Sequence, residues 1–379
     1  MSSELPTDME AIIFKKPYEV ALERVPTPKL EKEDDVIVKV HLAGLCGSDL
    51  HLYRGHEDAG KDYIMGHEVV GTIVQKGAAV KGFEIGEVVA VPFTVSCGHT
   101  ARCSSSQLFG TPSLPGCQAQ YVRIPLASSC LARKPKDLPD ELMLLMADIL
   151  PTGYSAAWNA WKLLDMGGGE RGGKGEQKGV CVVIGCGPSI KTKMSGEDSN
   201  TRIQRRSYID EFTPQVGLCA ISSAKTLFGT VYATDLTTSR LSLAEKHGAI
   251  ALPSSELGPA VLKATEGRGA DAVLEIVGHP SALYSALELV RPYGAVSSVG
   301  VHSKDLTING GLLYDKNVKM QFGRCSVRTF YQPALEVLAE NQEVFKSFIE
   351  HKVGFTQAAE YYELFEKNKV AKTVFVPGQ

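Results

Sequence analysis

Three side chains that could share one metal ion stand in segments rich in glycine or proline: Cys46 in GLCGSDLH, His67 in GHE and Asp148 in ADILPTGY. Thiolate, imidazole and carboxylate all bind zinc, and three protein ligands leave a fourth position open, as catalytic zinc sites do. The carboxylates of Asp49 and Glu68 could orient the imidazole or lie behind the metal. Spacing alone leaves an alternative, in which Cys46 is a buried thiol and His67 a hydrogen-bonded core histidine.

A second group of residues could bind the pyrophosphate of a dinucleotide. An apolar strand pattern, Val180–Ile184, leads into Gly185-Cys186-Gly187-Pro188, the first half of a GxGxxG loop. The third glycine is missing, and the expected helix resumes only at Val216-Gly217. Removing the 27 residues Ser189–Gln215 restores GCGPVG and shortens the distance from Gly187 to Asp235 from 48 to 21 residues. Because the usual distance is about 20 residues, we predict an inserted, solvated loop at 189–215 that reduces cofactor affinity.

Asp235 follows the second strand pattern, in VYATDL. An acidic residue there favours a free ribose 2′-hydroxyl, hence NAD over NADP, because a 2′-phosphate would meet like charge. Arg240 lies five residues further on and could contact the adenosine. Gly278 and Gly300 end later strands, at the edge where parallel sheets bind ligands. The alternative for Asp235 is a turn residue at a strand end.

The motifs GLCGSDLH, GHEVVG and ADILPTGY, in this order, resemble those of the zinc-containing medium-chain alcohol dehydrogenases, and the resemblance covers about residues 10–376. An aspartate in the position of Asp148 is similar to the formaldehyde dehydrogenase-like branch. The resemblance implies that Cys46, His67 and Asp148 bind the catalytic zinc.

The resemblance also implies roles for further residues. Ser48 and His51 would relay the alcohol proton, which suits a hydroxyl and a titratable imidazole three residues apart; the alternatives are a loop-capping hydroxyl and a surface histidine. The backbone near Val277 and Val301 would meet the nicotinamide half of the cofactor. Arg324 would lie near the cofactor phosphates or nicotinamide, or else make a surface ion pair.

The family's second zinc site, formed by four cysteines in a short lobe, is altered in this sequence. Cys97 and Cys103 resemble the first and last of the four, and the middle two are missing. Two thiolates cannot close a tetrahedral site. His99 or Cys117 could substitute, but we expect ordinary free thiols and no structural zinc.

The patterns around these motifs predict two domains. Residues 10–95 contain short β-branched runs separated by glycines, such as Val36–Val40 and Val69–Val74. From about residue 150, strand and helix patterns alternate, which indicates βαβ units and a parallel sheet. These patterns, taken with the resemblance, imply an α/β protein in which a β-rich GroES-like catalytic domain (1–152 and 304–379) accompanies a doubly wound Rossmann domain that binds NAD (153–303).

Composition excludes several classes of protein. The chain has 379 residues, 44% of them hydrophobic and 22% charged, which argues against disorder. A net charge of −3 offers no basic excess for nucleic acid. No apolar run approaches the roughly 20 residues of a membrane helix, and the start lacks a signal-peptide core. Nine cysteines in so long a chain favour reduced thiols. We expect a cytoplasmic protein.

These features together favour a zinc-dependent oxidoreductase that transfers hydride between NAD and a small-molecule alcohol or aldehyde. One alternative is a non-catalytic or cofactor-impaired family member, because both the phosphate loop and the cysteine lobe are altered. Another, suggested only by Asp148, is a dismutase-like enzyme that holds NAD(H) tightly. The resemblance implies a homo-oligomer, either a dimer or a tetramer, and the sequence does not identify the substrate.

Overall fold

A computed structural model of the chain describes residues 4–55, 60–98, 103–165, 179–185, 214–302 and 305–379. These residues form two compact units, one of residues 1–155 and 325–379 and the other of residues 156–324. In the described residues, no helix combines the length and the apolar character needed to cross a bilayer.

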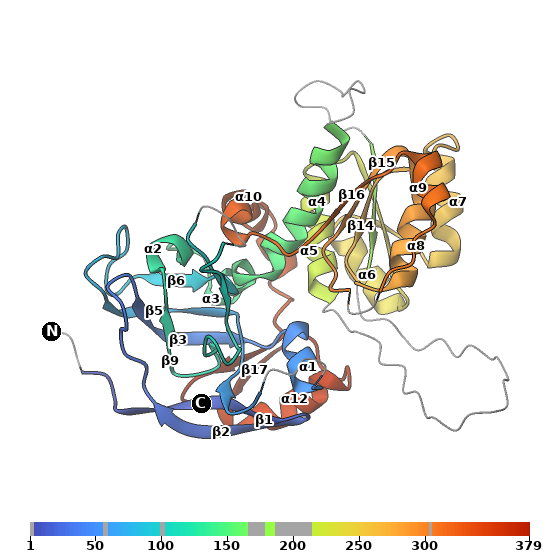
Figure 1. Cartoon of the computed structure of the whole chain (residues 1–379). Coiled ribbons are helices and arrows are strands. Elements are labelled where there is room, and N and C mark those ends of the chain that lie inside the picture. The colour runs from blue at the N-terminus through green and yellow to red at the C-terminus, as the bar shows by residue number, and fades with distance from the viewer. Residues whose placement is uncertain (1–3, 56–59, 99–102, 166–178, 186–213, 303–304) are drawn as a thin grey trace, which may run out of the picture. The chain divides into compact units, whose positions relative to one another are not determined.

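The first unit is rich in antiparallel sheet (Figure 1). Its largest sheet has the order β10-β6-β5-β3-β18-β17, with β9 also paired to β3. These strands are β3 (Val36–Gly44), β5 (Val69–Lys76), β6 (Val88–Val91), β9 (Tyr121–Ile124), β10 (Ala132–Arg133), β17 (His351–Gly354) and β18 (Thr373–Val376). A three-stranded sheet joins β1 (Asp8–Lys16), β2 (Glu19–Pro26) and β4 (Tyr63–Ile64), and a small one joins β7 (Thr94–Val95) and β8 (Gln107–Leu108).

Short helices connect and cover these sheets. They are α1 (Gly47–Tyr53), α2 (Ala127–Cys130), α3 (Asp140–Leu144), η1 (Leu145–Ala147), α10 (Val327–Glu340), α11 (Gln342–Phe345), η2 (Phe355–Gln357) and α12 (Ala358–Glu366). The core forms because the inward-facing β-branched side chains of β3 and β5, among them Val38 and Ile73, are fully buried. Helix α4 (Ile149–Asp165) begins in this unit and ends in the other.

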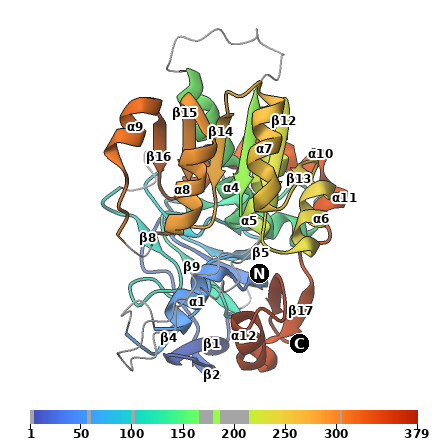
Figure 2. The ribbon, with the colours of Figure 1, turned by 90° about the vertical axis from the view of Figure 1, so that its right-hand side faces the viewer.

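The second unit contains a six-stranded parallel sheet in the order β13-β12-β11-β14-β15-β16. Its strands are β11 (Val180–Ile184), β12 (Thr230–Thr234), β13 (Ile250–Ala251), β14 (Ala270–Glu275), β15 (Val290–Ser298) and β16 (Lys319–Phe322). Its helices are α5 (Pro214–Lys225), α6 (Thr238–Lys246), α7 (Ser254–Ala264), α8 (Pro280–Leu289) and α9 (Gly310–Lys316). Figures 1 and 2 show α4 and α5 on one face of the sheet and α7 and α8 on the other.

The predicted α/β class with a doubly wound parallel sheet is thereby confirmed. The β11 and β14 strands are buried along their whole length, which explains why the sequence shows continuous apolar runs there rather than alternation. The second unit extends beyond residue 303, where we expected it to end, because α9 and β16 continue the alternation and β16 pairs with β15.

Two local expectations differ from the structure. α5 begins at Pro214, so the last two residues of the expected insertion belong to a helix; the remaining residues up to 213, and the linker up to 178, lie outside the described part of the chain. The sequence pattern also predicts a helix over Gln357–Lys369 with Thr356 as its N-cap. This cap assignment is wrong, because a 3₁₀ turn (Phe355–Gln357) runs directly into α12 and makes Gln357 the cap residue.

Candidate active site

The pairing of two strands brings Cys46 and His67 together. β3 and β5 are antiparallel and Ala43 is paired with Val69, so the end of one strand lies beside the start of the other. Cys46 follows β3 and His67 precedes β5 by two residues each. The Gly44 N–H donates to the Glu68 carbonyl at 2.9 Å and closes this corner. The register of an antiparallel pair therefore places both ligand types at one point.

Asp148 reaches the same point from the junction between η1 and α4. Its Oδ2 lies 3.7 Å from His67 Nε2 and 3.9 Å from Cys46 Sγ. Thr152, one helical turn further on, donates to its other oxygen at 2.8 Å. Among the described residues, potential ligand atoms of Cys46, His67, Glu68 and Asp148 all lie within 4.8 Å of one another.

This donor set fits zinc. Bonds of 2.0–2.3 Å in a tetrahedron put neighbouring ligand atoms roughly 3.3–3.8 Å apart, close to the separations of Asp148 from His67 and Cys46. His67 Nδ1 lies 3.1 Å from Asp49 Oδ1, which leaves Nε2 for a metal. The other Asp49 oxygen accepts the Cys46 N–H at 3.0 Å. The buried Asp49 carboxylate therefore orients both the His67 side chain and the Cys46 backbone.

The charges at this point also suit a cation. Burial disfavours a charge on His67, but the carboxylates of Asp49 and Asp148 hold the pKa of the imidazole well above its usual range. Burial likewise acts against ionised Asp148, and the contact with His67 keeps the pKa of Asp148 below its usual range. The cluster thus has an excess of negative charge, which a divalent ion would compensate.

Glu68 is held by a partner that the sequence analysis missed. The Lys372 ammonium donates to Glu68 Oε2, and both side chains are about 1% exposed. Burial alone would lower the pKa of Lys372, but Glu68 raises it. Glu68 Oε1 is buried without a hydrogen-bond partner in the described residues. Lys372 lies 304 positions away from Glu68, directly before β18, and its only sequence signal is a lysine beside a buried strand.

Ser48 and His51 both lie in α1. Ser48 Oγ is 3.9 Å from Cys46 Sγ, so its hydroxyl lies at the cluster. His51 is half-buried in the last turn of the helix. Residues three apart share a helix face, so the spacing suits a relay, which stays a prediction.

At the edge of the second unit, Asp235 follows β12 and is 8% exposed. Its Oδ1 accepts hydrogen bonds from Thr237 and lies 3.5 Å from Arg240 Nη1. Its Oδ2 is buried without a partner in the described chain, and burial raises the pKa of this carboxyl. A buried carboxylate oxygen that lacks a donor fits a ribose hydroxyl.

The predicted glycines are placed unequally. Gly185 follows β11 with a φ of 100°, and a Cβ there would lie 2.5 Å from Val277 Cγ2. Gly217 is buried within α5. Gly187 lies outside the described residues. The structure thus describes two of the three glycines of the interrupted loop.

The ends of β14 and β15 approach each other closely. A Cβ on Gly300 would lie 2.0 Å from the Gly278 nitrogen, so the two loops meet backbone to backbone. Glu275, which sequence reasoning missed, accepts hydrogen bonds from the Val277 and Gly278 N–H groups at 2.8 and 2.7 Å. Val301 is 44% exposed. Arg324 is exposed at the last position of the second unit.

In the described part of the cysteine lobe, a cysteine sulfur accepts a backbone hydrogen bond. The Cys97 N–H donates to Cys103 Sγ at 3.3 Å, and the metal-type group described above contains neither residue. Cys117 is fully buried among apolar side chains, and burial raises its thiol pKa far above the usual range, which disfavours a thiolate ligand. His99 lies outside the described residues.

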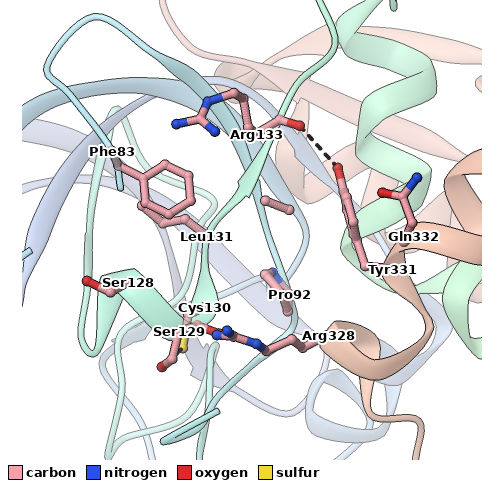
Figure 3. A pocket seen from close by; sticks show the side chains of 11 residues that line it. Phe83, Pro92, Ser128, Ser129, Cys130, Leu131, Arg133, Arg328, Tyr331 and Gln332 are labelled. Carbon is pink, nitrogen blue, oxygen red and sulfur yellow. Dashed lines mark hydrogen bonds between the residues drawn. The ribbon is translucent and has the colours of Figure 1, made fainter. Parts of the chain in front are cut away.

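A separate pocket of about 340 Å³ lies in the first unit and shares no residue with the metal-type group (Figure 3). The Tyr331 hydroxyl donates to the Arg133 carbonyl at 3.3 Å, and Arg328 donates to the Ser129 carbonyl at 2.5 Å. The guanidinium of Arg133 lies over the Phe83 ring and donates a hydrogen bond to the Glu87 carboxylate. These polar groups at the pocket are thus already hydrogen-bonded within the protein.

Comparison with known proteins agrees with this geometry. The alcohol dehydrogenase GroES-like domain matches residues 32–136, and the zinc-binding dehydrogenase domain matches residues 216–340. Zinc-type alcohol dehydrogenase B of Aspergillus flavus is 40% identical over the whole chain, which covers 83% of that protein. Medium chain reductase/dehydrogenase ucsI of an Acremonium species is 44% identical over 78% of this chain and 95% of its own.

Among solved structures, alcohol dehydrogenase TADH from Thermus sp. ATN1 has a TM-score of 0.82 at 29% identity, over 97% of this chain and 100% of its own. The predicted pairing of a GroES-like part with a Rossmann-like sheet is confirmed. The chain therefore belongs to the zinc-type medium-chain alcohol dehydrogenase family of oxidoreductases.

Proposed function

We propose that the chain is a zinc-dependent enzyme that oxidises or reduces a small alcohol or aldehyde with NAD(H). The observation that supports this most is the convergence of Cys46, His67 and Asp148, from three separate segments, at distances that suit zinc. Cys46 Sγ, His67 Nε2 and an Asp148 oxygen would hold the metal. The chemistry that zinc supplies in such a site is Lewis acidity, which favours loss of an alcohol proton and polarises a carbonyl.

The chain's own groups would then position and move protons. Asp49 fixes the imidazole tautomer through Nδ1. Ser48 would accept the alcohol proton beside Cys46, and His51, one turn along α1, would pass it to solvent. Glu68 and its partner Lys372 would keep a neutral ion pair behind the ligands.

The second unit would bind NAD. Asp235 Oδ2 would accept the ribose 2′-hydroxyl, with Arg240 beside the adenosine. Gly185, Gly187 and Gly217 would approach the pyrophosphate, and the backbone at Val277, Gly300 and Val301 would meet the nicotinamide half, with Arg324 near the cofactor. Nicotinamide supplies the hydride acceptor or donor. A homo-oligomer and a cytoplasmic location are part of the same proposal.

The first alternative is a member impaired in cofactor binding, since residues 189–215 separate Gly187 from Gly217. The second is the formaldehyde dehydrogenase-like branch, suggested by Asp148. Formaldehyde dismutase of Pseudomonas putida is 26% identical over 97% of this chain and 97% of its own length. A cofactor that stays bound through purification would favour this branch.

The test is a fluorescence titration of NADH into the zinc-loaded protein and into a variant that lacks Ser189–Gln215. If NADH binds the intact chain and its oxidation depends on an added aldehyde, the proposal stands. If only the shortened variant binds NADH, the intact chain is the impaired member. If neither form binds NADH, the assignment of the second unit is wrong.

A further inference from the structure

Gln118 is a fully buried amide outside the predicted ligand set. It is 0% exposed. Its backbone is paired on both sides, since its N–H donates to the Met65 carbonyl at 2.9 Å and its carbonyl accepts the Ile12 N–H at 2.8 Å. The segment that carries Gln118 thus runs beside the residues that lead to His67.

The side chain of Gln118 bridges two distant parts of the first unit. Its Nε2 donates to the Gly44 carbonyl at 3.0 Å, and its Oε1 accepts from the Tyr362 hydroxyl at 2.7 Å. The Gly44 carbonyl can only accept, so the amide nitrogen must face Gly44 and the oxygen must face Tyr362. Tyr362, in α12, is also fully buried. Its hydroxyl therefore fixes which way the amide points.

This bridge touches both turns that carry metal ligands. Gly44 lies two residues before Cys46. Gly66 directly precedes His67, has a φ of 89°, and lies so close that a Cβ there would be 2.5 Å from Gln118 Cγ. A single amide thus bonds one ligand turn and packs on the other.

We propose that Gln118, oriented by Tyr362, is a positioning residue of the metal centre: it holds the turns before Cys46 and His67 at the separation that zinc requires. This inference rests on the proposed function, because it needs a metal at those ligands. It differs from the role of Asp49, which contacts the ligands themselves. Without the amide, the Gly44 carbonyl loses a buried donor and the turns lose their common anchor.

The test compares Gln118→Met, which keeps the shape without the amide, with Tyr362→Phe, which removes one hydroxyl. Tyr232→Phe, at a buried tyrosine of the second unit, is the matched control. Two properties are measured: the rate of zinc release to a chelating dye, and the absorption spectrum of the cobalt-substituted protein, which reports ligand geometry. Urea unfolding is measured in parallel, so that lost stability is separated from lost metal geometry.

We expect Gln118→Met to release zinc about tenfold faster and to change the cobalt spectrum, because losing a group that supports ligands typically costs 10–100-fold in affinity. Made alone, Tyr362→Phe should speed zinc release several-fold. Added to Gln118→Met, it should not change the release rate further, since the Tyr362 hydroxyl acts through the Gln118 amide. The Tyr232→Phe control should release zinc at the parent's rate and keep the parent's cobalt spectrum.

Two results would overturn the inference. If both variants unfold more easily but keep the parent's cobalt spectrum and zinc release, the bridge only stabilises the fold, and the proposed function is untouched. If the parent itself binds neither zinc nor cobalt, the metal centre and this inference fail together.

Discussion

The metal cluster and the cofactor edge are positioned by different means. At the cluster, an antiparallel register brings Cys46 and His67 together, and side chains such as Asp49 tie the ligands to each other. At the proposed cofactor edge, the shared carboxyl end of parallel strands brings the residues together, and Asp235 Oδ2 has no partner in the described residues.

This difference would make the predicted insertion at 189–215 compatible with the fold. α5 begins at Pro214 and packs on β11 and β12 with Val216 and Leu218 buried, so the sheet keeps its covering helix. Long loops add little closure cost, about 0.6 kcal/mol per doubling of length. The predicted insertion would therefore bear on the phosphate loop, while the cluster of Cys46, His67, Glu68 and Asp148 uses no residue near it in the sequence.

The largest effect should come from removing a metal ligand. Because His67 Nε2 would bind the metal in the proposed site, His67→Ala should lower kcat/KM for alcohol oxidation by about a thousandfold or more. NADH affinity, measured by fluorescence, should stay near the parent's, since Asp235 and the strand ends are untouched. An equal loss of NADH binding would mean that the two regions are not independent.

The buried pair of Lys372 and Glu68 gives the next effect. Lys372→Met leaves a buried carboxylate unpaired and should destabilise the protein by about 3–5 kcal/mol in urea unfolding. Adding Glu68→Gln should restore much of that loss, because the uncompensated charge is gone. If the double variant is as unstable as Lys372→Met, the lost stability comes from packing rather than from the unpaired charge.

At the cofactor edge, Asp235→Ala should weaken NADH binding by roughly 10–100-fold, the value of a hydrogen bond to a charged group. The preference for NADH over NADPH should shrink as well, since the negative charge is removed. Zinc content, measured by atomic absorption, should not change. Unaltered affinity for both cofactors would contradict the role given to Asp235.

The smallest effect concerns pH. Burial lowers the pKa of His247, which contacts Ser222, to about 4. The unfolded chain, with an ordinary histidine pKa near 6.5, binds the proton first, so stability should fall as pH drops from about 6.5 toward 4. At pH 5.5 this amounts to roughly 1 kcal/mol. His247→Gln should remove this part of the pH dependence in unfolding measurements, whereas His351→Gln, at a more exposed histidine, should not.

Much of this arrangement could be predicted from local patterns. Cys46, His67 and Asp148 carry recognisable motifs, and the alternation of strands and helices predicts the parallel sheet. Lys372 and Gln118 could not be found in this way, because their contacts with Glu68 and Gly44 cross 304 and 74 positions of the sequence. α10 carries Pro333 inside the helix, which obscures its pattern.

The most direct test of the proposed zinc-dependent activity is a titration of metal-free protein with zinc while NADH formation from an alcohol is followed. The proposed zinc site predicts a rate of NADH formation that rises in proportion to added zinc and levels off at one equivalent per chain, since the described residues offer one group of suitable ligands. A rate that does not depend on zinc, or zinc-saturated protein that binds NAD without any turnover across a panel of alcohols and aldehydes, would contradict it.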